Sequence, residues 1–162
     1  MIRHSFEAPL PLEALAFLSR RTGVDFMRHD TSGWLCVTGW DGGLLLGMCC
    51  FEPKTWFDWH FSVAIDDPRC MSRRVLKAMF TAVFTQAVRI TALVEPDNAR
   101  ALDQMKRLGF QYEGYSRCGI EGTRDALIWG MLRDDCRFLP GYHGPGTVIP
   151  TDIAGEPHGQ LA

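Results

Sequence analysis

The stretch Val88–Phe110, VRITALVEPDNARALDQMKRLGF, decides the fold. Its first part is a short apolar run rich in β-branched residues that ends at Pro96, which is typical of a strand. Asp97 or Asn98 then suits the N-cap of a helix, and Gly109 suits its end. Three apolar residues between these caps recur at helical spacing and predict a buried stripe. They are Leu102, Met105 and Leu108.

The same signals predict the elements on either side of this stretch. Apolar periodicity indicates a first helix, a meander of three strands and a second helix capped by Ser72. Downstream, two strands flank a turn at Glu121-Gly122, and a short helical segment follows them. In chain order the ranges are Pro11–Arg21, Trp34–Trp40, Leu44–Phe51, Trp56–Ile65, the helix after Ser72, Arg89–Val94, the helix after Asn98, Phe110–Ile120, Asp125–Arg133 and Asp134–Leu139.

The connections between these elements predict how the strands pair. Only a short turn separates Leu44–Phe51 from Trp56–Ile65, so these two strands should be antiparallel neighbours. A helix connects Trp56–Ile65 to Arg89–Val94, and a strand–helix–strand unit joins parallel strands by a right-handed crossover. We therefore expect Ile65 to lie beside Arg89–Val94 as a parallel neighbour that splays away.

Composition places the chain among ordinary globular proteins. Of its 162 residues, 46% are hydrophobic and 22% are charged, and the net charge is −2. Such a charge gives no long-range attraction to nucleic acid or anionic lipid, and the longest apolar runs are shorter than a membrane span. We therefore expect neither nucleic acid nor a membrane as a partner.

The cysteines indicate the cellular compartment of the protein and do not indicate a metal or catalytic site. Six cysteines are present without a CxxC pair, and no secretory leader opens the chain. The sequence thus predicts reduced thiols, a cytoplasmic location and no metal site. No cysteine stands in a motif with a histidine and an acid, so a thiol nucleophile is rejected.

The chain divides into a domain and a tail. Residues 1–139 are expected to form one domain. Residues 140–162 are rich in glycine and proline, lack apolar periodicity and are predicted to be an extended tail. Ordering each residue costs on the order of 1–2 kcal/mol, so the tail should be ordered only against its own domain, a second copy or another protein.

The spacing Asn98-x2-Ala101-x7-Gly109-Phe110 resembles that of the GNAT N-acetyltransferases. The resemblance implies an α/β fold with a GNAT-type mixed, splayed β-sheet flanked by helices. It also implies that Asn98 contacts the pantetheine arm of coenzyme A. Two further tracts are similar to the ribosomal-protein acetyltransferases and to acetyltransferase-like proteins of bacteriophages. They are Gly109–Gly114 with Arg117, Asp125 and Met131-Leu132 for the first, and Met131–Cys136 for the second.

The family's pyrophosphate loop has the form Q/R-x-x-G-x-G/A, and its place in this chain is Met71–Leu76. Arg74 and Leu76 stand where the family has glycines, and a Cβ there crowds the approach of phosphate to backbone N–H groups. Two interpretations stay open. Either Arg73 and Arg74 hold the phosphates with their side chains, or cofactor binding is lost and both are solvated. The cofactor-binding residues that the resemblance implies are Val63, Ile65, Ser72, Arg73, Arg74, Val75 and Asn98.

A base must take the proton of the substrate amine. His60 and Asp58 lie two apart on the predicted strand Trp56–Ile65 and so share one face, and Glu52 ends the strand before it. His60 has the pKa range for this task, although a strand histidine between aromatic residues is also a common packing residue. The backbone amides of Val63–Ile65, at an expected bulge of the strand, would bind the thioester carbonyl.

Met105 stands where the family often has a tyrosine that protonates the departing thiolate, and a thioether cannot donate a proton. The leading hypothesis is an acetyl-CoA-dependent N-acetyltransferase that transfers the acetyl group directly to an amine of a small molecule or a protein. The alternative rests on the missing loop glycines and on Met105. It is a catalytically degenerate GNAT-fold structural or interaction protein of a phage particle, located in the virion.

Overall fold

The structure, a computed structural model, describes residues 1–142. Within them, seven strands form one sheet in the order β1-β2-β3-β4-β5-β7-β6. β4 and β5 are parallel, and all other neighbours are antiparallel. The predicted α/β class with a mixed sheet is confirmed. The strands are β1 (Arg3–Glu7), β2 (Leu35–Asp41), β3 (Leu44–Pro53), β4 (Asp58–Ile65), β5 (Arg89–Val94), β6 (Gln111–Ile120) and β7 (Arg124–Leu132).

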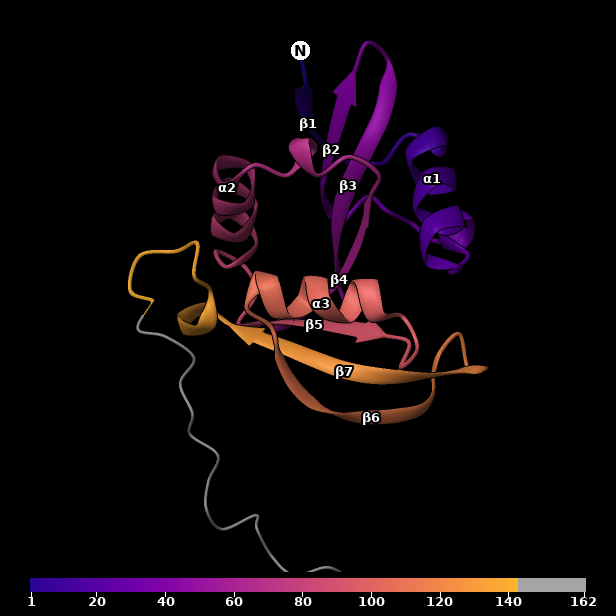
Figure 1. Ribbon diagram of the computed structural model, residues 1–162, viewed down its shortest axis with the longest axis vertical. Coiled ribbons are helices and arrows are strands. Elements are labelled where there is room, and N and C mark those ends of the chain that lie inside the picture. The colour runs from indigo at the N-terminus through magenta and orange to yellow at the C-terminus, as the bar shows by residue number, and fades with distance from the viewer. Residues whose placement is uncertain (143–162) are drawn as a thin grey trace, which may run out of the picture.

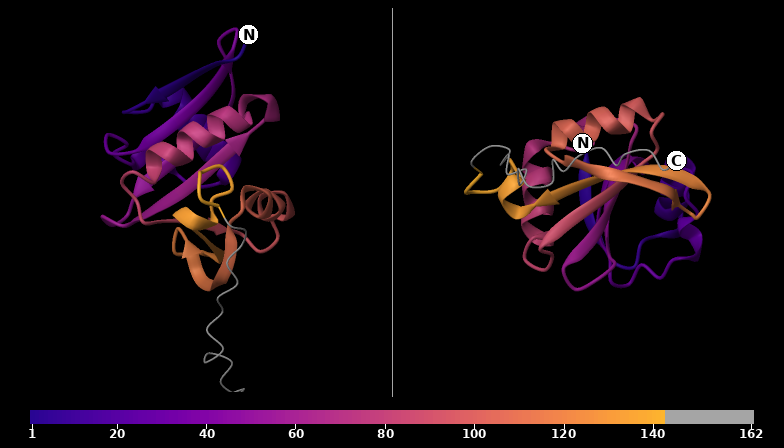
Figure 2. Two further views of the ribbon diagram at one scale, coloured as in Figure 1. Left: turned by 90° about the vertical axis from the view of Figure 1, so that its left-hand side faces the viewer. Right: turned by 90° about the horizontal axis from the view of Figure 1, so that it is seen from below.

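The sheet splits into two arms between β4 and β5 (Figure 1). The parallel ladder runs only from the pair Asp58↔Arg89 to the pair His60↔Thr91. Beyond it, β4 continues to Ile65 beside β3, while β5 continues beside β7. Figure 2 shows the β1–β4 arm and the β5–β7–β6 arm running in different directions. The predicted antiparallel and parallel pairings are therefore confirmed, although the parallel contact lies at the start of β4 and not at Ile65.

Helices cover both faces of the sheet and divide the core in two. One face carries α1 and η1, which pack with even-numbered residues of β3 and β4 such as Met48 and Ala64. The other face carries α2 and α3, which pack with odd-numbered residues such as Phe51 and Phe61. Side chains alternate along a strand, so even and odd positions of β4 face different cores. The bounds are α1 (Leu12–Thr22), η1 (Phe26–Arg28), η2 (Pro68–Cys70), α2 (Arg73–Val83), α3 (Ala99–Leu108) and η3 (Arg133–Asp135).

The caps of α2 and α3 agree with the predicted ones. Ser72 Oγ accepts a hydrogen bond from the Val75 N–H at 3.4 Å, and Asn98 Oδ1 accepts one from the Ala101 N–H at 3.0 Å. Gly109 ends α3 at a φ of 102°, which a residue without a Cβ adopts freely. Both helices therefore begin, and α3 also ends, where local sequence chemistry places them.

Several elements differ from the sequence prediction. The sequence does not predict β1, because Arg3–Glu7 carries one large apolar residue and edge strands are often polar. β4 begins at Asp58 and not at Trp56, because the Asp58 N–H donates to Thr55 Oγ1 at 2.9 Å and this closes a turn. The helix expected over Asp134–Leu139 is only the single turn η3.

The predicted tail begins at Pro140, and residues 143–162 lie outside the described part of the chain. The docking prediction for residues 140–162 therefore concerns a segment that the structure does not describe. Among residues 1–142, no helix is both long enough and apolar enough to cross a bilayer.

The segment between β4 and α2 is anchored by Cys70, the last residue of η2. Its buried side chain fits against Gly39 and Gly47, which face each other across β2 and β3. A Cβ on Gly39 would lie 2.6 Å from Cys70 Cβ, and one on Gly47 would lie 2.7 Å from Cys70 Sγ. His4 Nε2 donates to the Cys70 carbonyl at 2.7 Å. These contacts hold the start of α2 against the sheet.

We expect Gly47→Ala to lower the free energy of unfolding by about 1–3 kcal/mol, the usual cost of an overpacked core. The added methyl group would also meet the Ala64 carbonyl oxygen at 3.1 Å. Chemical denaturation should show a smaller loss in the Cys70→Ala background, where the sulfur is absent. Gly33→Ala, whose Cβ would meet its nearest neighbour at 3.8 Å, is the control and should be near neutral. An equal loss in both backgrounds would mean that Cys70 is not the obstacle.

Candidate functional site

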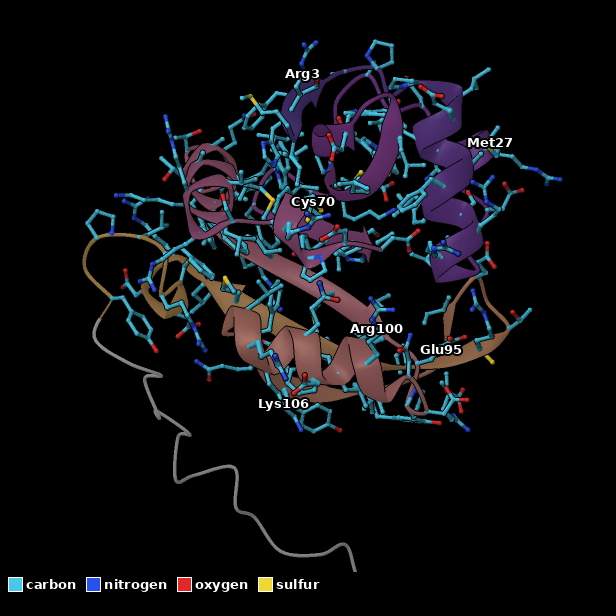
Figure 3. All side chains as sticks on the ribbon, turned by 45° about the horizontal axis from the view of Figure 1, so that its top comes forward. Arg3, Met27, Cys70, Glu95, Arg100 and Lys106 are labelled. Atoms are coloured by element: carbon cyan, nitrogen blue, oxygen red, sulfur yellow. The ribbon has the colours of Figure 1, made fainter. Side chains whose placement is uncertain are left out.

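A cavity of about 220 Å³ occupies the gap between β4 and β5. It is bordered by both arms of the sheet, by α3 and by the segment that runs from the end of α1 through η1. In Figure 3, Arg100 points from α3 towards the β1–β4 arm, and Glu95 lies where β5 ends. Its polar lining includes the side chains of His29, Glu52, Lys54, His60, Glu95 and Asn98.

The cavity reaches both faces of the sheet. Val63 and Met105 line it on the side of α2 and α3, where both belong to the larger core. His60 and Ser62 are even-numbered like Ala64, so they line it on the side of α1 and η1. A molecule bound on one face can therefore meet a molecule bound on the other through the gap.

β4 presents backbone groups to the gap beyond its ladder with β5. Arg100 Nη2 of α3 donates to the Ile65 carbonyl at 2.8 Å, so this carbonyl faces the gap. The N–H and C=O groups of alternate residues point to the same edge of a strand, so those of Val63 face the gap as well. The register of β4 with β3 runs unbroken from Trp59 to Ile65. The prediction of a bulge at Val63–Ile65 is therefore wrong.

His60 stands in the gap directly across from Glu52 on β3. Burial lowers the pKa of His60 below its usual value, and the Asp58 carboxylate partly offsets this effect. At neutral pH the imidazole is therefore largely uncharged and can accept a proton.

Glu52 is the acidic group on this side of the cavity. Its Oε1 accepts from Lys54 Nζ at 2.6 Å and lies 3.6 Å from His29 Nδ1. Its side chain is 20% exposed, so a ligand can reach it. The sequence suggests Glu52 beside His60 and Asp58 among the residues near the base, at the end of the preceding strand. It does not indicate His29 or Lys54 at all, because no sequence signal places η1 beside the end of β3.

Asp58 shares the face of His60, as predicted, but it does not line the cavity. Its Oδ1 accepts a hydrogen bond from Thr91 Oγ1 at 2.8 Å and lies 3.6 Å from Arg89 Nε. Arg89 in turn donates to Glu113 Oε2 at 2.5 Å. Asp58 thus belongs to a network that joins β4, β5 and β6, and it acts on His60 through its charge.

The residues predicted to hold phosphate lie apart from this cavity. Ser72, Arg74 and Val75 line a second hollow of about 380 Å³ on the side of β1. Arg73 and Arg74 are exposed, and no ion pair joins them to another residue of the described range. Leu76, at a glycine position of the family loop, packs against the larger core. The start of α2 therefore offers two guanidinium groups in place of a glycine cradle.

Met105 and the cysteines restrict the available chemistry. Met105 is buried and lines the cavity, and its thioether cannot donate a proton. All six thiols are free and five of them are buried. Burial raises the pKa of Cys49 and Cys50, and it raises the pKa of Cys70 to about 11. These thiols keep their protons at neutral pH, which argues against a thiol nucleophile.

No family model and no curated protein sequence matches this chain. Solved structures do match it. A GNAT family acetyltransferase from Elizabethkingia anophelis, with acetyl-CoA bound, superposes with a TM-score of 0.58 at 9% identity. The match covers 81% of this chain and 97% of that one. The chain therefore has the GNAT acetyltransferase fold.

Two further structures show the same likeness. The ribosomal-protein-S18-alanine N-acetyltransferase from Escherichia coli gives a TM-score of 0.63 at 16% identity, over 82% of this chain and 94% of that chain. A Bacillus subtilis acetyltransferase in complex with CoA gives 0.61 at 12% identity, over 82% of this chain and 99% of that chain. At such identities the likeness establishes the fold, including the splayed sheet that the resemblance of Asn98–Phe110 implied.

We expect Asn98→Ala to lower the free energy of unfolding by about 1 kcal/mol, because the Ala101 N–H loses the oxygen that caps it. Asn98→Asp keeps an oxygen in the same place and adds a negative charge at the helix start, so it should unfold like the unmodified protein. Thermal unfolding of the three proteins measures the difference. Equal losses of unfolding free energy in both variants would show that Asn98 does not stabilise the protein through the capping hydrogen bond.

Proposed function

We propose that this chain is an acetyl-CoA-dependent N-acetyltransferase that transfers an acetyl group directly to an amine. One observation carries the proposal: a single cavity between the parted strands has His60 on one side of the sheet and Asn98 on the other. Direct transfer needs donor and acceptor to meet in one site. The GNAT fold, with acetyl-CoA or CoA bound in two structural neighbours, supports the same reaction.

The residues present fit the pantetheine arm of coenzyme A. Backbone groups of Val63 and Ile65 face the gap, and an extended chain that carries amides can pair with a free strand edge. Asn98 lines the same cavity. Arg100 donates a hydrogen bond to the Ile65 carbonyl. This hydrogen bond would have to break before the pantetheine arm could use the same carbonyl as an acceptor. Arg73 and Arg74 would hold the phosphates with side chains rather than with backbone N–H groups.

The proposed mechanism uses an uncharged histidine and backbone donors. When bound, acetyl-CoA supplies a thioester whose carbon–sulfur bond breaks as the bond to the amine nitrogen forms. His60 would accept the proton of the amine, because its lowered pKa keeps the imidazole uncharged. The Val63 N–H would donate to the thioester carbonyl oxygen and stabilise its developing charge. Met105 supplies no proton to the departing sulfur, so that proton would come from water.

A GNAT-fold protein without coenzyme A is the second candidate. It is favoured by Leu76 and Arg74 at the glycine positions and by Met105 at the tyrosine position. The comparisons give no support to a phage particle as its setting. The free cysteines fit a reducing, cytoplasmic compartment.

Isothermal titration with coenzyme A tests the proposal. We expect binding, and we expect Arg73→Ala and Arg74→Ala each to weaken it by about 1–3 kcal/mol, the scale of a charge-assisted hydrogen bond to phosphate. Arg117→Ala removes another exposed arginine, from β6, and is the control. No binding to the unmodified protein would favour the second candidate. Unchanged affinity in both variants would mean that Arg73 and Arg74 are solvated charges only.

We expect kcat/KM for acetyl transfer to rise with pH through a pKa below the usual value of a histidine, because protonated His60 cannot accept a proton and burial lowers its pKa. His60→Gln should remove this limb and reduce kcat by about 10²–10⁴-fold. Asp58→Asn should move the limb to lower pH, since it removes a carboxylate that raises the pKa of His60. Thiol release over a pH series measures all three. A limb that persists in His60→Gln would assign the base to another group.

A further inference from the structure

The open end of the gap is closed by a clasp, which we define as Gly23, Asp25, Glu95, Glu121 and Arg124. Arg124, at the start of β7, donates to Glu95 Oε1 at 2.5 Å and to the Gly23 carbonyl at 2.9 Å. Glu121, in the β6–β7 turn, accepts from the Asp25 N–H at 2.8 Å. Figure 1 shows this turn rising towards the end of α1. The clasp therefore joins the two arms where the strands are apart.

Both sides of the clasp are shaped for this contact. Gly23 ends α1 at a φ of 69°, and a Cβ there would lie 3.1 Å from Arg124 Nη1. The side chains of Arg124 and Glu95 are each 29% exposed, so solvent screens their ion pair less than a fully exposed one. Glu121 Oε2 is a third acceptor, 3.3 Å from Arg124 Nη2. Three acceptors around one planar guanidinium fix its orientation.

The clasp and the parallel ladder together enclose the gap. The ladder closes one end at His60↔Thr91, and the clasp closes the other at the end of β5. Val24 and Ile120, which adjoin clasp residues in the chain, line the cavity. Ligands can thus reach the cavity through the two faces of the sheet, but not along its open edge.

The enclosed cavity has room for a small acceptor. Its volume is about 220 Å³. This space must hold the acetyl end of the donor as well as the amine. A polypeptide acceptor also needs a groove for the residues that follow its reactive amine, each of which adds about 3.3 Å of extended chain. The clasp closes the edge of the gap to such a chain, which leaves it only the face that carries His60.

We propose that the acceptor is a small amine rather than the terminus of a polypeptide, and that Glu52 receives its ammonium group. This inference rests on the proposed function. Glu52 is partly exposed and faces His60 across the β3–β4 pair. A carboxylate attracts the amine as a cation, and the neighbouring imidazole then takes the proton that the nitrogen must lose before it can attack. Recognition and proton removal thus stand side by side on one face of the sheet.

Two sets of acceptors test the inference. One set contains small primary amines, and the other contains peptides with free N-terminal amines. We expect the best small amine to exceed the best peptide in kcat/KM by about 100-fold, the scale of discrimination by a shaped pocket. Calorimetric titration of both sets into the protein saturated with CoA gives a readout that does not depend on turnover. Small amines should bind there, and peptides should not.

Three variants address the named residues. Arg124→Ala removes the contacts that hold the arms together, and we expect the ratio of peptide to small-amine kcat/KM to rise by about tenfold or more. Glu121→Gly, which suits the φ of 53° at that position, loosens the same clasp and replaces Arg124→Ala if the latter does not fold. Arg117→Ala is the control and should leave the ratio unchanged. Glu52→Gln should raise the KM of small amines by about tenfold, the loss of one charge-assisted contact.

The outcomes separate this inference from the proposed function. Peptides that react as fast as small amines with the unmodified protein would overturn the inference and leave the transferase standing. Transfer to neither set, with coenzyme A bound, would overturn the proposed function itself. An unchanged ratio in both clasp variants would overturn the role of the clasp, and an unchanged KM in Glu52→Gln would overturn the role of Glu52.

Discussion

The separation of β4 from β5 after the pair His60↔Thr91 is the constraint on which the rest of the structure depends. Each strand keeps a full partner on its outer side, β3 for β4 and β7 for β5. Only the inner edges lose their ladder, and backbone groups there need other partners because an unpaired buried amide is costly. Arg100 meets this need at the Ile65 carbonyl. The free edge that suits an amide-bearing ligand is therefore a direct result of the parted strands.

The parts of the fold that follow from the sequence are those with local causes. A strand that ends before Pro96, a cap at Asn98 and a stop at Gly109 each depend on neighbours within a few residues, and the structure has all of them. β1 has no such local signal. It is held by its pairing with β2, where Arg3 lies opposite Trp40, and this contact spans a long stretch of chain. Patterning cannot reveal a strand whose stability comes from a distant partner.

The same distinction separates the predictable site residues from the others. Strand alternation places His60 and Asp58 on one face, and the resemblance places Asn98 at the gap. Neither gives distances between elements. The contacts of Glu52 with Lys54 and His29 are therefore known only from the folded structure. The prediction for Ser72–Val75 finds the start of the helix correctly. The structure places Ser72, Arg74 and Val75 at the second hollow, whereas His60 lines the cavity between β4 and β5.

A cavity that reaches both faces of a sheet has a kinetic meaning. In the proposed transferase, donor and acceptor would enter through different openings, so neither would have to leave before the other arrives, and a ternary complex could assemble in either order. Direct transfer would need no acetylated form of the protein, and burial, which raises the pKa of Cys49 and Cys50, argues against a thiol as an acetyl carrier. The two products of that reaction would also depart from opposite sides. In the proposed transferase, the splayed sheet would thus leave the order of binding free while it fixes the place of reaction.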